Sequence, residues 1–185
     1  AKNIILISEK KDNFFLSISK KFKLFFIEHK NYIGGRYSVL SEVGIVPAYL
    51  MGVDIFKLRS NIQSYLKGSE KLFLKESSVY LAGILNLKKI NNLVFLNYSP
   101  ELEKFLFWCQ QLIAESLGKK GKGFLPVISN VPKDHHSLLQ LYLDGPRDKL
   151  FYIFSYDDKK QEKVNIRKAS SKINFLNRKS LNSIK

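Results

Sequence analysis

Cysteine is almost absent from this sequence, and its scarcity removes several classes of protein. The single cysteine, Cys109, has no partner for an internal disulfide, and no Cys-based metal site can be built from it. Cysteine usage of this kind is typical of a reducing compartment, so we expect a cytoplasmic protein. No apolar run reaches the roughly 18 residues that a membrane-spanning helix needs, and the first residues lack the pattern of a signal peptide.

Acidic residues are also scarce, with 16 against 31 basic residues and a formal net charge of +15. A basic excess of this size permits nucleic-acid binding. The lysines are scattered, however, and form no stripe beside exposed aromatic residues, so nucleic acid is not favoured as a partner. The abundance of Lys, Asn, Ile and Phe indicates a compositional bias of the source. A phosphorylated small molecule would suit the positive potential equally well.

The hydrophobic content of 45% over 185 residues is that of a folded chain with a core of its own. Residues 3–8 form an apolar run that suits a strand buried on both faces, and chains seldom begin on a central strand. After Phe154 the sequence becomes basic and polar. We therefore expect one domain over residues 1–155, a basic connector over residues 156–185 that is partly disordered, and a chain that is part of a larger protein.

Apolar runs alternate with longer segments of helical periodicity along the chain. Strands are predicted at residues 4–7, 23–27, 93–96, 124–128 and 150–154. Helices are predicted at residues 13–21, 42–51, 55–67, 70–85, 100–116 and 137–143, with Pro47 as a kink or first turn and Pro100 at a helix start. This alternation predicts an α/β fold, a three-layer sandwich in which helices flank a mostly parallel five-stranded sheet.

Two segments carry residue types suited to chemistry. In the loop over residues 31–41, Gly34 and Gly35 free the backbone to approach a ligand, and Arg36 brings fixed charge suited to a developing oxyanion. Further on, Glu115 stands near the end of a predicted helix, where the macrodipole does not favour its ionised form. With partial screening from water such a carboxyl suits proton transfer, and Gln111, four residues earlier, lies on the same face. On spacing alone, a surface Arg and a solvent-facing Glu remain the simpler interpretations.

Three segments resemble glucose-6-phosphate isomerase, and they occur in the order of that family. Residues 32–44 (YIGGRYSVLSEVG) resemble the family signature, and residues 112–119 (LIAESLGK) resemble the segment around its catalytic Glu. Residues 134–146 (DHHSLLQLYLDGP) resemble the bacterial form of the segment that carries its ring-opening His. The three matches cover most of residues 2–154. The resemblance implies the second sugar isomerase (SIS) domain of that enzyme, truncated at both ends.

The resemblance also implies a role for each matching residue. Glu115 matches the base that moves a proton between C1 and C2 of the open-chain sugar phosphate, and Arg36 matches the residue that steadies the enediolate. Gly35 and Gln111 match residues that line the substrate pocket. His136 matches the His that assists ring opening, although His135 stands where the bacterial pattern has Gln. No metal and no redox cofactor is implied, and the substrate is a sugar phosphate, glucose 6-phosphate or fructose 6-phosphate.

Two parts of the family pattern have no counterpart in the chain. The phosphate-binding Ser/Thr-rich loop of the preceding domain is missing, and so is the catalytic Lys of a C-terminal helix. The family delivers its His across a homodimer interface, so we expect the isolated chain to be weakly active or inactive. Two alternatives stay open: a non-catalytic sugar-phosphate-binding module of the same fold and, less favoured, a basic nucleic-acid-binding domain.

Overall fold

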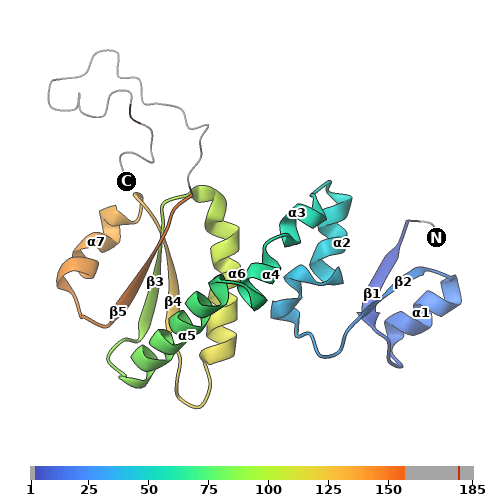
Figure 1. Ribbon diagram of the computed structural model, residues 1–185, viewed down its shortest axis with the longest axis horizontal. Coiled ribbons are helices and arrows are strands. Elements are labelled where there is room, and N and C mark those ends of the chain that lie inside the picture. The colour runs from blue at the N-terminus through green and yellow to red at the C-terminus, as the bar shows by residue number, and fades with distance from the viewer. Residues whose placement is uncertain (1–2, 157–178, 180–185) are drawn as a thin grey trace. The chain divides into compact units, whose positions relative to one another are not determined.

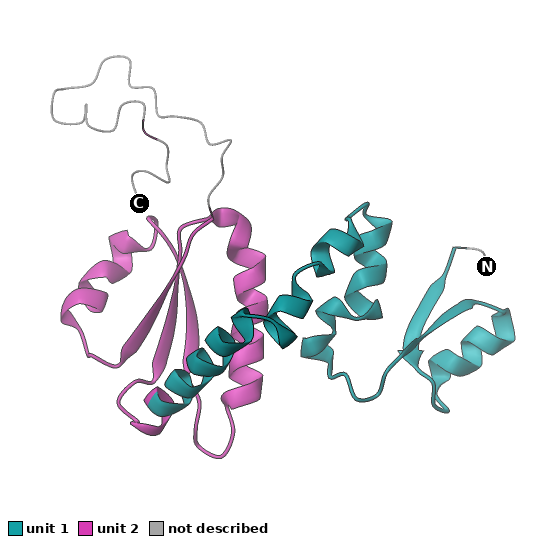
Figure 2. Ribbon diagram, in the orientation of Figure 1, with its two compact units in different colours: residues 1–83 teal, residues 84–185 magenta. Residues whose placement is uncertain are grey.

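The computed structural model of the chain describes residues 3–156 and 179. The described elements alternate between strands and helices (Figure 1), as the sequence predicts for an α/β fold. They divide into two compact units, residues 1–83 and residues 84–185 (Figure 2). The predicted domain over residues 1–155 stays a prediction, and the predicted disorder of residues 156–185 lies almost wholly outside the described residues.

In the first unit, β1 (Ile5–Glu9) and β2 (Phe25–His29) form a two-stranded parallel sheet connected by α1 (Phe14–Phe22). Helix α1 begins one residue later than predicted, because Asn13 caps it: the Asn13 side chain accepts a hydrogen bond of 2.9 Å from the Leu16 backbone N–H. It ends at Phe22, and the C-cap residue Lys23 has a left-handed backbone with a φ of 50°. Both strands run in the same direction, so their carboxyl ends meet at one edge.

The segment after β2 is more regular than a loop. It contains a 3-10 helix, η1 (Gly35–Leu40), followed by α2 (Glu42–Leu50), which carries Pro47 in its interior. The single helix predicted at residues 55–67 is wrong: α3 (Ile55–Arg59) and α4 (Ile62–Lys67) are separate helices. Asp54 caps α3 by accepting from the Lys57 backbone N–H at 3.0 Å, and the Ser60 hydroxyl donates to the Lys57 carbonyl at 2.9 Å. These local bonds end α3 before it can continue into α4. Helix α5 (Glu70–Asn86) follows.

The second unit contains a three-stranded parallel sheet in the order β4-β3-β5, made of β3 (Asn92–Asn97), β4 (Leu125–Asn130) and β5 (Lys149–Phe154). A single 3-10 turn, η2 (Pro100–Leu102), leads into α6 (Glu103–Leu117), so Pro100 begins that turn and α6 starts three residues later. Helix α7 (His135–Asp144) connects β4 to β5 and begins two residues earlier than predicted.

The expected five-stranded sheet is wrong, although each predicted strand is present within two residues. The described strands pair as one sheet of two and one of three. An apolar run predicts a strand but does not identify the neighbouring strand, because every strand presents the same backbone donors and acceptors along its edges. The parallel pairing and the flanking helices are confirmed.

The hydrophobic core lies in the second unit. Leu93, Phe95, Leu106 and Phe124 form a buried cluster, with Leu106 fully inaccessible to solvent. Cys109 is half-buried and packs against this cluster, and burial raises the pKa of its thiol. Among the described residues, no hydrophobic side chain of the first unit is buried; its buried residues are Ser19 and Ser38.

Candidate functional site

Glu115 and Gln111 lie together on α6, one helical turn apart. The Gln111 Nε2 donates a hydrogen bond of 2.9 Å to Glu115 Oε1, which fixes the orientation of the carboxylate. Both side chains are exposed, whereas the sequence suggested partial screening of Glu115 from water. The pairing of these two residues on one face is as predicted.

The end of α6 just beyond Glu115 is set by Gly118. Its backbone N–H donates to the Ala114 carbonyl at 2.9 Å, and a Cβ at position 118 would lie 2.5 Å from that oxygen. Only glycine therefore fits this close approach without a shift of the backbone. The chain then turns through residues 119–122, where Lys119 and Lys122 form an isolated bridge, and enters β4.

His135 and His136 open α7 and have different surroundings. His135 is half-buried, and its ring meets that of Tyr98 edge to face at a centroid distance of 6.0 Å. His136 is exposed. Since His135 is engaged in packing against the loop after β3, His136 is the more accessible of the two neighbours, and its role in ring opening stays a prediction.

Polar side chains hold the loop from which α7 begins. The backbone N–H of Asn130 donates to Asp134 Oδ2 at 2.7 Å, and the Asn130 side chain donates to Glu103 Oε1 at 3.0 Å. Asn97, only 2% exposed, donates to Asn130 Oδ1 at 2.9 Å. The sequence analysis missed this network, although Asn97 and Asn130 are recognisable as amides at the ends of two apolar runs.

Within the second unit, Glu115 and His136 lie at opposite ends of the strands: Glu115 near their amino ends and His136 at their carboxyl ends. Strands β3 and β4 are parallel, and the carboxyl end of β3 leads directly into η2 and α6. Helix α6 then runs back along the sheet (Figure 1), so Glu115 comes close to the amino edge, roughly 18 Å of helix from Glu103. His136 follows β4 at the carboxyl edge. One chain therefore does not bring these two residues into one site within this unit.

Gly35 and Arg36 begin η1 in the first unit. The Arg36 guanidinium lies over the Tyr37 ring at 4.9 Å from its centroid, and the side chain is half-buried. The Ser38 hydroxyl donates to the Gly35 carbonyl at 2.7 Å. A Cβ added at Gly35 would meet nothing within 4 Å. The space above Gly35 is thus open to an approaching ligand. Arg36 and Glu115 belong to different units, so their convergence on one cleft stays a prediction.

A His–Glu pair near this segment was missed by the sequence analysis. His29, the last residue of β2, places Nδ1 at 2.5 Å from Glu42 Oε1, and Glu42 is the first residue of α2. The hydrogen bond to Glu42 raises the pKa of His29. The pKa of the Glu42 carboxyl is lowered, first by a hydrogen bond from its own backbone N–H and then by the hydrogen bond with His29. The two residues are 13 positions apart, so no helical or strand period links them in the sequence.

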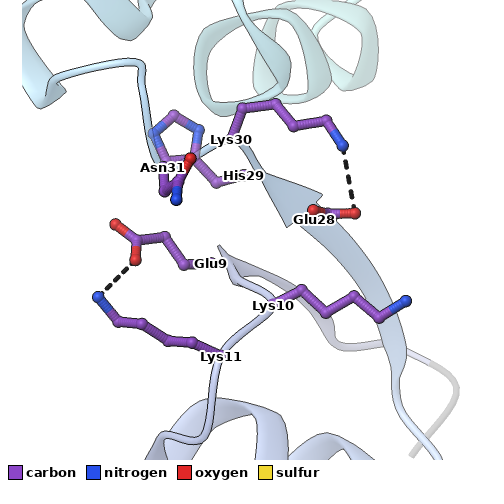
Figure 3. A pocket seen from close by; sticks show the side chains of 7 residues that line it. All are labelled: Glu9, Lys10, Lys11, Glu28, His29, Lys30 and Asn31. Carbon is purple, nitrogen blue, oxygen red and sulfur yellow. Dashed lines mark ion pairs between the residues drawn. The ribbon is translucent and has the colours of Figure 1, made fainter.

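A shallow pocket of about 130 Å³ lies at the carboxyl ends of β1 and β2 (Figure 3). Its lining is strongly charged, and two of its lysines face carboxylates: Lys11 contacts Glu9 at 2.5 Å, and Lys30 contacts Glu28 at 3.3 Å. His29 is also among the lining residues. Two of the three lining lysines are thus paired with carboxylates, and Lys10 adds a further positive charge.

Neither a metal cluster nor a membrane span is found in the part of the chain that the structure describes. Over residues 3–156 and 179, no three His, Cys, Asp or Glu side chains are grouped so that they could hold a metal ion. None of the helices described over the same residues combines the length and the apolar character needed to cross a membrane.

Comparisons with known proteins identify relatives of part of the chain. No protein-family model matches it. A glucose-6-phosphate isomerase of Methanocaldococcus jannaschii is 38% identical over 124 residues, covering 64% of this chain and 30% of that protein. The protein of the same name from Acholeplasma laidlawii is 34% identical over 155 residues, covering 82% of this chain and 36% of that protein.

A solved structure shares the fold. The crystal structure of a hypothetical protein from Thermus thermophilus superimposes with a TM-score of 0.82, covering 99% of this chain and 46% of that protein at 24% identity. This likeness concerns the fold alone. The chain spans 30% and 36% of the lengths of the two isomerases above, so it corresponds to a portion of each. The chain is therefore homologous to part of the glucose-6-phosphate isomerases, as the three sequence segments predict.

Proposed function

We propose that the protein to which this chain belongs interconverts glucose 6-phosphate and fructose 6-phosphate through an enediolate, in glycolysis and gluconeogenesis. The observation that carries the proposal is the Gln111–Glu115 hydrogen bond of 2.9 Å, in a chain homologous to part of the glucose-6-phosphate isomerases. It presents an oriented carboxylate on an exposed helix face. Substrate, homodimeric assembly and cytoplasmic location are all part of this proposal.

Glu115 acts as the base in this mechanism. It takes the proton from C2 of the open-chain aldose and returns it to C1, so one carboxylate serves both steps. A general base of this kind contributes about 10²–10⁴-fold to the rate. Gln111 limits the rotation of the carboxylate, which reduces the entropy lost when the reacting atoms align.

Arg36, His136 and Gly35 complete the set. The Arg36 guanidinium stabilises the enediolate oxygens as negative charge builds, an effect worth roughly 3–4 kcal/mol for a well-placed donor. His136 delivers a proton to the ring oxygen, which suits an imidazole because its ordinary pKa lies near neutrality. Gly35 lets the backbone approach the sugar. The positions of Glu115 and His136 at opposite ends of the strands support a site to which a second copy of the chain contributes His136.

A Glu115→Gln variant of the full-length protein tests the base. The amide keeps the size of the side chain and removes its basicity, so isomerisation should fall by at least about 10²-fold. Exchange of the C2 proton of the sugar phosphate with deuterated solvent should fall in parallel. Glu101→Gln, at another exposed acid, is the matched control and should change neither rate. If Glu115→Gln still binds sugar phosphate and isomerises at the normal rate, Glu115 is not the base, and this chain is a non-catalytic sugar-phosphate-binding module of the full-length protein.

A Gly35→Ala variant tests whether the sugar approaches the backbone of η1. The methyl group meets no protein atom within 4 Å, so the melting temperature should stay unchanged while the KM for sugar phosphate rises. Gly44→Ala is the structural contrast, because its Cβ would lie 2.0 Å from the Val39 carbonyl oxygen and should destabilise the fold. Unchanged kinetics in Gly35→Ala would remove Gly35 from the pocket.

The 185-residue chain by itself should isomerise weakly or not at all, because it spans about a third of its relatives. Its turnover is compared with that of the full-length protein at equal protomer concentration. Equal turnover would show that every required group lies in these residues.

A further inference from the structure

His29 connects three parts of the backbone around the segment that holds Arg36. It is the last residue of β2, and its Nδ1 lies 2.5 Å from Glu42 Oε1 at the first turn of α2. Its other ring nitrogen, Nε2, lies 3.0 Å from the carbonyl oxygen of Ile33. The contact between His29 and Glu42 thus joins the two ends of the segment over residues 30–41, which includes Gly35 and Arg36.

The chemistry of the two partners decides the charge of His29. A carbonyl oxygen only accepts, so Nε2 carries a hydrogen, and an ionised carboxylate also only accepts, so Nδ1 carries the other. A ring that donates from both nitrogens is an imidazolium. The pKa of His29 is raised, chiefly by Glu42, and the pKa of Glu42 is lowered, which agrees with an ion pair of charged partners. The side chains are 15% and 22% exposed, so water screens the pair only partly.

Other charges near His29 are mostly engaged elsewhere. Glu9 is its cross-strand neighbour in the β1–β2 register and contacts Lys11 at 2.5 Å, and the flanking Glu28 and Lys30 contact each other at 3.3 Å (Figure 3). Glu42 is therefore the carboxylate that faces Nδ1. Apolar packing gives η1 little support, because no hydrophobic side chain among the described residues of the first unit is buried.

We propose that His29 and Glu42 are positioning residues that hold the Arg36 guanidinium in the orientation needed for isomerisation. The Ile33 carbonyl directly precedes Gly34, whose own carbonyl accepts from the Tyr37 backbone N–H at 2.9 Å to start η1. At the other end, the Ser41 hydroxyl donates to the Ser38 carbonyl at 2.8 Å immediately before Glu42. Anchoring both ends fixes the first turn of η1 and with it the backbone from which Arg36 extends. This inference rests on the proposed function.

A double-mutant cycle in the full-length protein tests the inference. His29→Gln and Glu42→Gln should each lower kcat for sugar-phosphate isomerisation by on the order of tenfold, within the hundredfold that a misplacement of about 1 Å costs. The KM should change by less than about twofold, because Arg36 acts on charge that develops after binding. In an Arg36→Ala background, the same two changes should have no further effect on the residual kcat.

Two controls separate positioning from general stability. Glu42→Asp keeps the carboxylate and should retain more activity than Glu42→Gln, while Lys30→Gln removes a neighbouring charge and should leave kcat unchanged. The melting temperature is recorded for each variant, and Glu42→Gln carries the test if His29→Gln fails to fold.

The outcomes are distinguishable. If the His29 or Glu42 changes lower kcat by the same factor with and without Arg36, the positioning role is overturned while the proposed function stands. If Arg36→Ala itself isomerises at the normal rate, the role of Arg36 in the proposed function fails and the positioning inference falls with it.

Discussion

The two units of this chain are stabilised in different ways. Residues 84–185 contain a buried cluster that includes Leu93, Phe95 and Leu106 around a three-stranded sheet. Residues 1–83 have a two-stranded sheet, several short helices and, among the described residues, no buried hydrophobic side chain. Local polar contacts therefore matter more in the first unit: the Asn13 cap, the Asp54 cap and the His29–Glu42 pair. Of the candidate site residues, Gly35 and Arg36 belong to the weakly cored unit, and Gln111, Glu115 and His136 to the other.

The largest effect should come from deleting core volume in the second unit. Leu106→Ala removes a fully buried side chain and should lower the free energy of unfolding by about 2–5 kcal/mol. The same substitution at Leu66 in the first unit, 58% exposed, should cost no more than about 0.5 kcal/mol. Urea denaturation of both variants measures the difference. Comparable losses would show that the first unit has a core as dependent on apolar packing as the second.

A buried amide should come next. Asn97→Ala removes the donor to Asn130 Oδ1 and the acceptor of the Ser99 backbone N–H, at a cost of about 1–3 kcal/mol. The exposed Asn91, also in the second unit, is the control and should change stability by no more than about 0.5 kcal/mol. An equal and small effect at both positions would mean that water replaces the lost partners.

In the first unit, removing a helix cap should have a smaller and more local effect. Asn13→Ala deletes the acceptor for the Leu16 N–H and should cost about 1 kcal/mol. Amide hydrogen exchange should quicken in α1 and stay unchanged in β3. Faster exchange spread evenly over both units would contradict the picture of locally stabilised helices.

The smallest effect should be the pH dependence of the His29–Glu42 pair. The raised pKa of His29 gives stability that is fully present below the ordinary value of 6.5 and is lost as pH rises through the folded-state value. The lowered pKa of Glu42 gives stability that is present above 4.5 and is lost as pH falls through its folded-state value. The pair therefore contributes most between pH 4.5 and 6.5.

His29→Gln should remove the part of the pH dependence of folding stability that comes from this pair. The stability difference between the wild type and the variant should be at most about 1 kcal/mol at pH 6, because both side chains stay partly exposed, and should shrink as the pH rises. Chemical denaturation at several pH values gives the curve. A difference that is constant up to alkaline pH would mean that His29 is neutral in the folded protein.

The sequence predicted what depends on local pattern. The apolar runs at residues 93–96 and 150–154 became β3 and β5, and the helical spacing of Gln111 and Glu115 gave the observed hydrogen bond. The prediction of one helix over residues 55–67 did not allow for the hydrogen bonds by which Asp54 caps the start of α3 and the Ser60 hydroxyl closes its end, so two helices were predicted as one.

What the sequence did not predict depends on three-dimensional placement. The split into two sheets follows from which strands share backbone hydrogen bonds, and the contact of His29 with Glu42 needs η1 to fold between them. The placement of Glu115 and His136 at opposite ends of the strands follows from the direction of α6, which periodicity does not reveal. Their roles, together with those of Arg36, Gly35 and Gln111, remain predictions.

The position of Cys109 offers a practical consequence. It is the only thiol in the sequence, it packs against the core of the second unit, and burial raises the pKa of its sulfur. A maleimide or disulfide reagent should therefore modify the native chain slowly and the opened chain quickly. The rate of labelling at this sulfur therefore reports how often the packing around Cys109 in the second unit opens, with no engineered reporter needed.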